Sequence, residues 1–120
     1  MGKFTLKKVP TGIKFDLRAD NGEIIAVSEV YKTEAACKAG IQSICRYAPA
    51  ATTEDLTEPA EKPVSNPKFQ LYRDRSGAYR FRLRARNGKI IAASEGYTTK
   101  NAALLGIESV KENVCPEELT

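Results

Sequence analysis

The sequence contains no histidine, and this absence excludes several kinds of chemistry. A Ser/His/Asp triad and a Cys/His dyad both need an imidazole as general base. A zinc site that uses imidazole ligands is excluded for the same reason. The chain has three cysteines with no CxxC spacing, which fits reduced thiols better than a disulfide framework. No group of residues suggests a reaction, so we expect a non-enzymatic protein with no catalytic residue, metal site or cofactor.

A long apolar run is also absent from the first twenty residues, where cations stand among single apolar side chains. Both a signal peptide and a membrane span need an uninterrupted apolar stretch. We therefore expect no membrane partner and a cytoplasmic location.

What the chain does contain is the composition of an ordinary globular domain. It has 120 residues, of which 42% are hydrophobic and 28% are charged. The formal net charge is +4, and it is unevenly placed. Up to residue 66 there are nine Lys and Arg against nine Asp and Glu, whereas the remainder has ten against six. The whole positive excess therefore belongs to the second half.

Most of the sequence is an internal repeat, in which similar stretches recur about sixty-six positions apart. The stretch KFDLRADNGEIIAVSEVY begins at Lys14, and RFRLRARNGKIIAASEGY begins at Arg80. Further on, EDLT at 54–57 returns as EELT at 117–120. A period of this length corresponds to one supersecondary unit, so the pattern indicates a duplication and not a long solenoid.

Within each copy the hydrophobic period changes from two to about 3.6. In the first copy, residues 3–8, 13–19 and 23–31 read as three strands, and the following segment reads as a helix with Thr33 as its N-cap. The helix carries Gly40, whose cost of roughly 1 kcal/mol relative to Ala suggests a close approach between helix and sheet. The second copy repeats these features, with Thr99 and Gly106 in the equivalent places.

An Asn-Gly pair joins the second and third strands of each copy, at Asn21 and at Asn87. This pair predicts a two-residue type I′ turn, in which both central residues have positive φ. In the second copy Arg84 would then face Ile91, and Arg86 would face Lys89. In the first copy this register gives a core face composed of Phe15, Leu17, Ala19, Ile24 and Ala26.

Two longer stretches carry a resemblance to a known family. NGEIIAVSEVYKTEAACKAGIQSI and NGKIIAASEGYTTKNAALLGIESVKENV resemble the two repeats of the YegP-like family, small bacterial proteins of uncharacterised function. The resemblance implies tandem β(3)-α-β units that build a single sheet and exchange their final strands, and it implies no catalytic residues. The second copy reaches EELT three residues sooner after its helix than the first reaches EDLT, so its last strand is expected to be short or missing.

We therefore predict an α+β protein in which two tandem β(3)-α-β repeats share one antiparallel sheet, with two helices on one face. Residues 1–57 would form the first repeat, 58–66 a linker, and 67–120 the second repeat with its short final strand. One repeat of about fifty residues would bury too little apolar surface to be comfortably stable. The two repeats are therefore expected to form one compact domain.

The strongest functional signal is a run of cations in the second copy. Residues 67–92 carry eight Lys and Arg against Asp74 alone. A ribbon of this kind can contact phosphates, so the first functional hypothesis is weak binding of a polyanion such as nucleic acid. The simpler interpretation is a solvated sheet face, on which Arg80 pairs with Glu95 across the strands. The candidate site comprises Arg80, Arg82, Arg84, Arg86 and Lys89.

A protein-interaction module is the alternative function. In the predicted register, Ile25, Val27 and Ile91 form an apolar strip on the outer face of the sheet. Such a strip suits a protein partner or weak self-association. The sequence specifies neither a ligand nor a partner.

Overall fold

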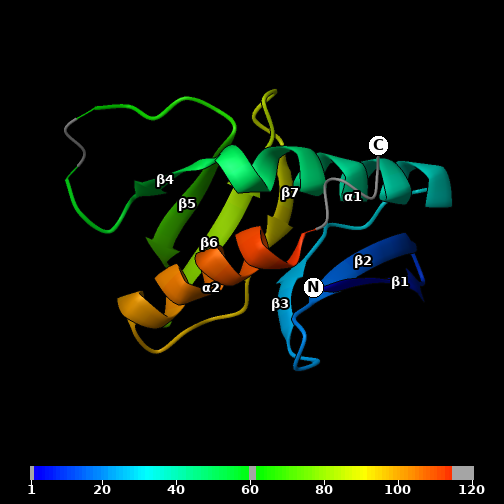
Figure 1. Ribbon diagram of the computed structural model, residues 1–120, viewed down its shortest axis with the longest axis horizontal. Helices are drawn as coiled ribbons and strands as arrows, with labels where there is room; N and C mark the ends of the chain where they lie inside the picture. Colours follow the sequence, from blue (N-terminus) through cyan, green and yellow to red (C-terminus); the bar gives the residue numbers. More distant parts are fainter. Residues whose placement is uncertain (1, 60–61, 115–120) are drawn as a thin grey trace.

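The computed structural model describes residues 2–59 and 62–114 (Figure 1). The protein is α+β, with one seven-stranded sheet and two helices. None of the described helices is long and apolar enough to cross a membrane. In chain order the elements are β1 (Lys3–Val9), β2 (Gly12–Arg18), β3 (Ile24–Val27), α1 (Glu34–Tyr47), the 3-10 turn η1 (Ala48–Ala50), β4 (Thr52–Asp55), β5 (Lys68–Arg73), β6 (Tyr79–Arg84), β7 (Ile90–Ala93) and α2 (Lys100–Asn113).

The strand order in the sheet is β1-β2-β3-β7-β6-β5-β4, so the two halves of the chain meet at β3 and β7. Those two strands are joined in register through Val27 and Ala93. Strand β4 belongs to the first half by sequence, yet it pairs with β5 of the second half, and this pairing is parallel. The sheet is therefore mixed, and the wholly antiparallel sheet expected from the sequence is wrong. The final strand expected at 117–120 lies outside the described residues.

The two helices lie together on one face of the sheet and close a common core (Figure 1). Helix α1 contacts β2 and β7, whereas α2 contacts β6, β3, β2 and β5. Each helix therefore packs against strands of both halves. Strand alternation directs the largest side chains toward the helices, and Phe15, Phe69 and Phe81 are almost completely buried there.

A tyrosine accounts for the glycine in each helix. The ring of Tyr31 stacks on Phe15, with ring centroids 6.3 Å apart, and its hydroxyl end lies against Gly40. In the second half, Tyr97 stacks on Phe81 in the same way and lies against the helical glycine at position 106. The close approach predicted from the glycines is therefore present, and it is made by the tyrosine and phenylalanine rings.

The hairpin tips differ from the predicted type I′ turns. The amide of Gly22 donates to the carbonyl of Ala19 at 2.9 Å, and the amide of Ala19 donates to the carbonyl of Glu23 at 2.9 Å. Gly22 has a φ of 87°, whereas no non-glycine residue in the described part of the chain has positive φ. The loop therefore has three residues, with a type I turn followed by a left-handed glycine.

This longer loop shifts the register of the hairpin. Arg18 pairs with Ile24, and a bulge between Leu17 and Arg18 leaves one extra residue in β3 before the expected pairing resumes at Ala26. The extra residue is Ile25, which turns into the core and is only 8% exposed, whereas Ile24 is 37% exposed. The predicted faces of these two isoleucines are therefore wrong. The second half has the same bulge.

Candidate anion-binding face of the sheet

One face of the sheet is not covered by either described helix, and strand alternation places most of the strand cations on it. Phe81 and Leu83 point to the core, so the arginines that alternate with them along β6, at positions 80, 82 and 84, point outward. The same alternation applies to the other long strands. The cations of this outer face are Lys3, Lys7, Lys14, Arg18, Lys68, Arg80, Arg82 and Arg84, and the acidic residues of the same strands on this face are Asp16 and Glu54.

Two of these arginines share a single neutral acceptor. The Oε1 atom of Gln70 accepts hydrogen bonds from Nε of Arg82 at 2.8 Å and from Nε of Arg84 at 2.6 Å. The guanidinium of Arg82 also lies over the ring of Tyr72, 4.6 Å from its centroid. Arg84 donates a further hydrogen bond to the carbonyl of Gly88 at 2.7 Å. Both guanidinium groups are therefore held side by side in fixed positions.

The orientation of Gln70 is itself fixed by an acidic residue on the next strand. Nε2 of Gln70 donates to Oε1 of Glu54 at 2.8 Å, and the same oxygen lies 3.0 Å from Nζ of Lys68. These contacts with Gln70 and Lys68 lower the pKa of the Glu54 carboxyl. Among the described residues, neither Arg82 nor Arg84 has a carboxylate within ion-pair distance. Their charge is therefore not neutralised within this part of the protein.

Arg80 has a different environment from its two neighbours. Its Nε lies 2.6 Å from Oδ2 of Asp74, and its Nη1 donates to the carbonyl of Ser94 at 3.2 Å. The hydrogen bond and charge of Asp74 raise the pKa of Arg80. The ion-pair partner is therefore Asp74, in the turn between β5 and β6, and not the Glu95 predicted from strand pairing.

The remaining cations of the candidate site lie at the tip of the β6–β7 hairpin. Arg86 is in the three-residue loop, while Lys89 faces Ala85, whose amide donates to the carbonyl of Lys89 at 2.9 Å. The predicted opposition of Arg86 and Lys89 is therefore wrong. The structure gathers Arg82 and Arg84 around one acceptor and leaves these two cations exposed at the tip.

Sequence reasoning missed Gln70, although it bonds both arginines. Alternation along KFQLYR places this residue on the same face as the arginines, which was the available signal. The sequence pattern does not show that β5 lies beside β6 in the register that pairs Gln70 with Arg82.

The apolar strip expected on the outer face is not formed as predicted. Ile25 and Ile91 are buried, with 8% and 7% exposed, and Val27 is half-buried beside Ala93. A hollow of about 390 Å³ lies next to Val27, and Arg82 is among the residues that line it. The apolar area on the outer face is therefore smaller than expected, and it lies next to Arg82.

The protein is thus an α+β protein with one sheet that carries helices on one face and cations on the other. Comparison with known protein families shows to which family it belongs. The model of the family described as "Domain of unknown function (DUF1508)" matches residues 12–55 and 74–118. The chain belongs to this family. One matched segment lies in each half of the sequence.

Named relatives agree with this assignment and with the resemblance noted in the sequence. The UPF0339 protein YegP of Yersinia pestis is 34% identical over 114 residues, which cover 94% of this chain and 88% of that protein. The UPF0339 protein plu2779 of Photorhabdus laumondii is 36% identical over 110 residues, covering 91% and 83%. A solution NMR structure of yegP from E. coli, a protein of unknown function, matches with a TM-score of 0.75 at 30% identity, covering 93% of this chain and 84% of that chain. The predicted membership of the YegP-like family is confirmed.

Proposed function

We propose that the protein is a non-enzymatic binding module for a phosphate-bearing polyanion, most simply single-stranded nucleic acid, on the outer face of its second half. The observation that carries the proposal is the shared hydrogen bonding of Arg82 and Arg84 to Gln70. A neutral acceptor positions the two guanidinium groups without cancelling their charge. A carboxylate in the same place would position them but also neutralise them.

The geometry leaves donors for a ligand. Gln70 uses the Nε–H of each arginine, so most of the terminal N–H groups of Arg82 remain for phosphate oxygens, which guanidinium groups bind bidentately. Because the planar group of Arg82 is already stacked on Tyr72, less side-chain freedom is lost when it binds. A single-stranded ligand would also allow its bases to contact the adjoining apolar hollow.

The first half provides an internal comparison. The residues equivalent to Arg82 and Arg84 are Asp16 and Arg18, and these two form an ion pair at 3.3 Å. The position equivalent to Gln70 is occupied by Thr5. At these two positions the first half therefore has an ion pair, whereas the second half has two arginines without a carboxylate among the described residues, and this difference favours Arg82 and Arg84 as the site.

Fluorescence anisotropy with labelled single-stranded and duplex oligonucleotides across a salt series tests this proposal. The test variant is Arg82→Ser with Arg84→Ser, and the matched control is Lys38→Ser with Arg46→Ser, an equal charge change on α1. We expect binding that weakens with salt, and a shallower salt dependence in the test variant because fewer counterions are released. Absence of binding at low salt, or equal losses in the two variants, would overturn the proposal.

A second candidate function is a protein-interaction surface at the junction of β3 and β7. It is favoured by the exposure of Ile24, which is 37% exposed on the outer side of the sheet, near the half-buried Val27. Sedimentation velocity over a range of protein concentrations tests the simplest form, self-association. A concentration-independent sedimentation coefficient for the wild type would argue against it.

We also infer that the two halves are tandem repeats of one β(3)-α-β unit. The two helices have 14 residues each, and each begins after a threonine whose side chain accepts the amide of the third residue after it. The stacked Phe15 and Tyr31 correspond to the stacked Phe81 and Tyr97. A circular permutant that starts at residue 62 tests the inference, since two equivalent units should fold in either order.

A further inference from the structure

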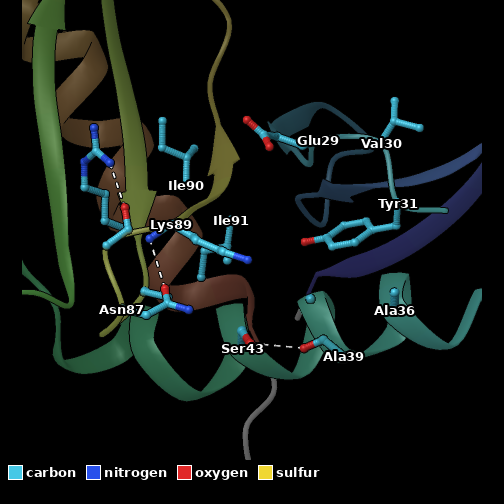
Figure 2. A pocket seen from close by; sticks show the side chains of 14 residues that line it. Glu29, Val30, Tyr31, Ala36, Ala39, Ser43, Asn87, Lys89, Ile90 and Ile91 are labelled. Carbon is cyan, nitrogen blue, oxygen red and sulfur yellow. Dashed lines mark hydrogen bonds between the residues drawn. The ribbon is translucent and has the colours of Figure 1, made fainter. Parts of the chain in front are cut away.

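A groove of about 600 Å³ lies where the loop after β3, helix α1 and the tip of the β6–β7 hairpin meet (Figure 2). Strands β3 and β7 pair at Val27 and Ala93, and the groove is lined by residues that follow β3 and by residues that precede Ala93 on the β6–β7 hairpin. The adjoining part of α1 contributes small side chains to the groove, including Ala36 and Ala39. We propose that this groove binds a small organic anion, a carboxylate or a phosphate ester with a short apolar tail.

The polar groups of the groove converge from opposite walls. Figure 2 shows the side chains of Tyr31 and Lys89 pointing toward one another, with Ile91 beside them. Among the residues that the structure describes, the Tyr31 hydroxyl has no hydrogen-bond partner and the Lys89 ammonium has no ion pair. A cation and a hydroxyl donor without protein partners match the requirements of one anionic head group.

Two neighbouring residues refine the head-group site. The amide of Lys89 donates to Oδ1 of Asn87 at 3.0 Å, which directs the NH₂ group of the Asn87 side chain away from that contact as a further donor. Burial raises the pKa of Tyr31, so its hydroxyl keeps its proton and remains a donor. The site therefore offers the three donors that a carboxylate or a phosphate ester can accept.

The rest of the groove sets the size and charge of the ligand. Ile90, Ile91 and Ala39 supply an apolar lining next to the donors, which suits a short alkyl or aromatic tail. Glu29 also lines the groove, and its carboxylate limits the negative charge that the groove can accept, which disfavours a ligand with several anionic groups. A small ligand with one charged end is therefore favoured over the polyanion proposed for the outer face.

The duplicated sequence shows which residues distinguish this groove from its counterpart. The positions equivalent to Lys89 and Ala39 in the other half are Glu23 and Leu105. One reverses the charge, and the other places a bulky side chain, 63% exposed, where the groove has a methyl group. The anion-binding features are therefore specific to one of the two equivalent places.

NMR titration of ¹⁵N-labelled protein tests the proposal with defined probes: hexanoate, hexyl phosphate, uncharged hexanamide and inorganic phosphate. We expect saturable shifts of the backbone amides of Tyr31, Ser43, Lys89 and Ile91 with hexanoate, with hexyl phosphate, or with both. The probe with the lower Kd identifies the head group. Hexanamide lacks the charge and inorganic phosphate lacks the apolar tail, so each should bind at least fivefold more weakly than the better probe.

Two variants replace a groove residue by the residue at the equivalent position in the other half of the chain. Lys89→Glu and Ala39→Leu both alter exposed residues, so the fold should be kept, and each should weaken binding of the better probe at least fivefold. The control is Lys38→Glu, the same charge change on the same helix that carries Ala39. Equal binding of hexanamide, shifts that do not saturate, or a loss in the control as large as in Lys89→Glu would each overturn the proposal.

Discussion

The hydroxyl end of Tyr31 occupies the space into which a β-carbon on Gly40 would project. The second half repeats this relationship, since the Tyr97 hydroxyl lies 2.6 Å from the β-carbon position of Gly106. Each tyrosine closes the core where its third strand leads into the helix. A glycine at a mid-helix position is therefore a packing requirement, and the cost in helix propensity is offset by the ring.

Replacement of Gly40 by Ala should destabilise the protein despite its better helix propensity. The propensity gain is roughly 1 kcal/mol, whereas displacing a packed ring typically costs about 1–3 kcal/mol. Urea denaturation should show a net loss of about 1 kcal/mol in the free energy of unfolding. In a Tyr31→Ala background the same substitution should cost much less, because the closest contact is gone and only Cε2 of Phe15, 3.2 Å from the β-carbon position, must move. The same loss in both backgrounds would contradict this explanation.

The bulge in the first hairpin predicts opposite behaviour for two adjacent isoleucines. Ile25→Ala removes a buried side chain and should cost about 2–5 kcal/mol. Ile24→Ala alters a residue that is 37% exposed and should cost under about 1 kcal/mol. Thermal or urea unfolding of the two variants measures the difference. The reverse order of stability would mean that the unbulged register is the correct one.

The Ser94 hydroxyl, directly after β7, makes one buried and one partly buried hydrogen bond. Its Oγ accepts from the amide of Phe81 at 2.9 Å and donates to the carbonyl of Glu95 at 2.8 Å. Ser94→Ala leaves that amide without its side-chain acceptor and should cost about 1–3 kcal/mol. Hydrogen exchange should become faster at the Phe81 amide in particular. Ser65→Ala, at an exposed position, is the control and should change neither quantity.

Asp74 should make stability depend on acid pH. Hydrogen bonds from Ser76 and then Arg80 hold the pKa of its carboxyl far below the usual range. A carboxyl whose pKa is lower in the folded state stabilises the protein above its unfolded pKa of about 4, and the contribution disappears as pH falls below that value. Asp74→Asn should therefore lower the Tm at pH 7, and its difference from wild type should shrink between pH 4 and pH 2.

The control for this pH series is Glu108→Gln, which removes one negative charge from an exposed position on α2. It should not reproduce the pH-dependent difference. A constant difference in Tm between wild type and Asp74→Asn at every pH would show that the carboxylate charge does not contribute.

The repeated patterns were sufficient to predict the order of the described strands and helices, although the third strand, expected at 23–31, spans only Ile24–Val27. Thr33 and Thr99 begin the helices as N-caps, as their spacing predicted. The face of each β3 or β7 residue could not be predicted, since Ile24, Ile25 and Ala26 are all apolar. In such a run a one-residue bulge leaves no trace in the alternation of polar and apolar residues.

The partners of the arginines were also beyond sequence reasoning, for a different reason. Arg80 takes its carboxylate from a turn, and Arg82 and Arg84 take their acceptor from a neighbouring strand. Gln70 lies directly opposite Arg82, whereas Arg84 reaches it diagonally, and neither contact can be assigned until β5 is known to lie beside β6 in this register. The lack of an acidic residue directly across from Arg82 and Arg84 could be predicted, but not that Gln70 would hold both of them or that Asp74 would pair with Arg80.

Because β4 pairs with a strand of the second half, the first half cannot complete its strand pairing while the chain is being synthesised. During synthesis the first half emerges before β5 exists, so β4 has no strand beside which to lie. The open side of β3 must likewise wait for β7, which is among the last elements to be translated. A nascent chain that has emerged from the ribosome only as far as residue 66 would therefore display unpaired strands, and at that stage it is most exposed to aggregation and to chaperones.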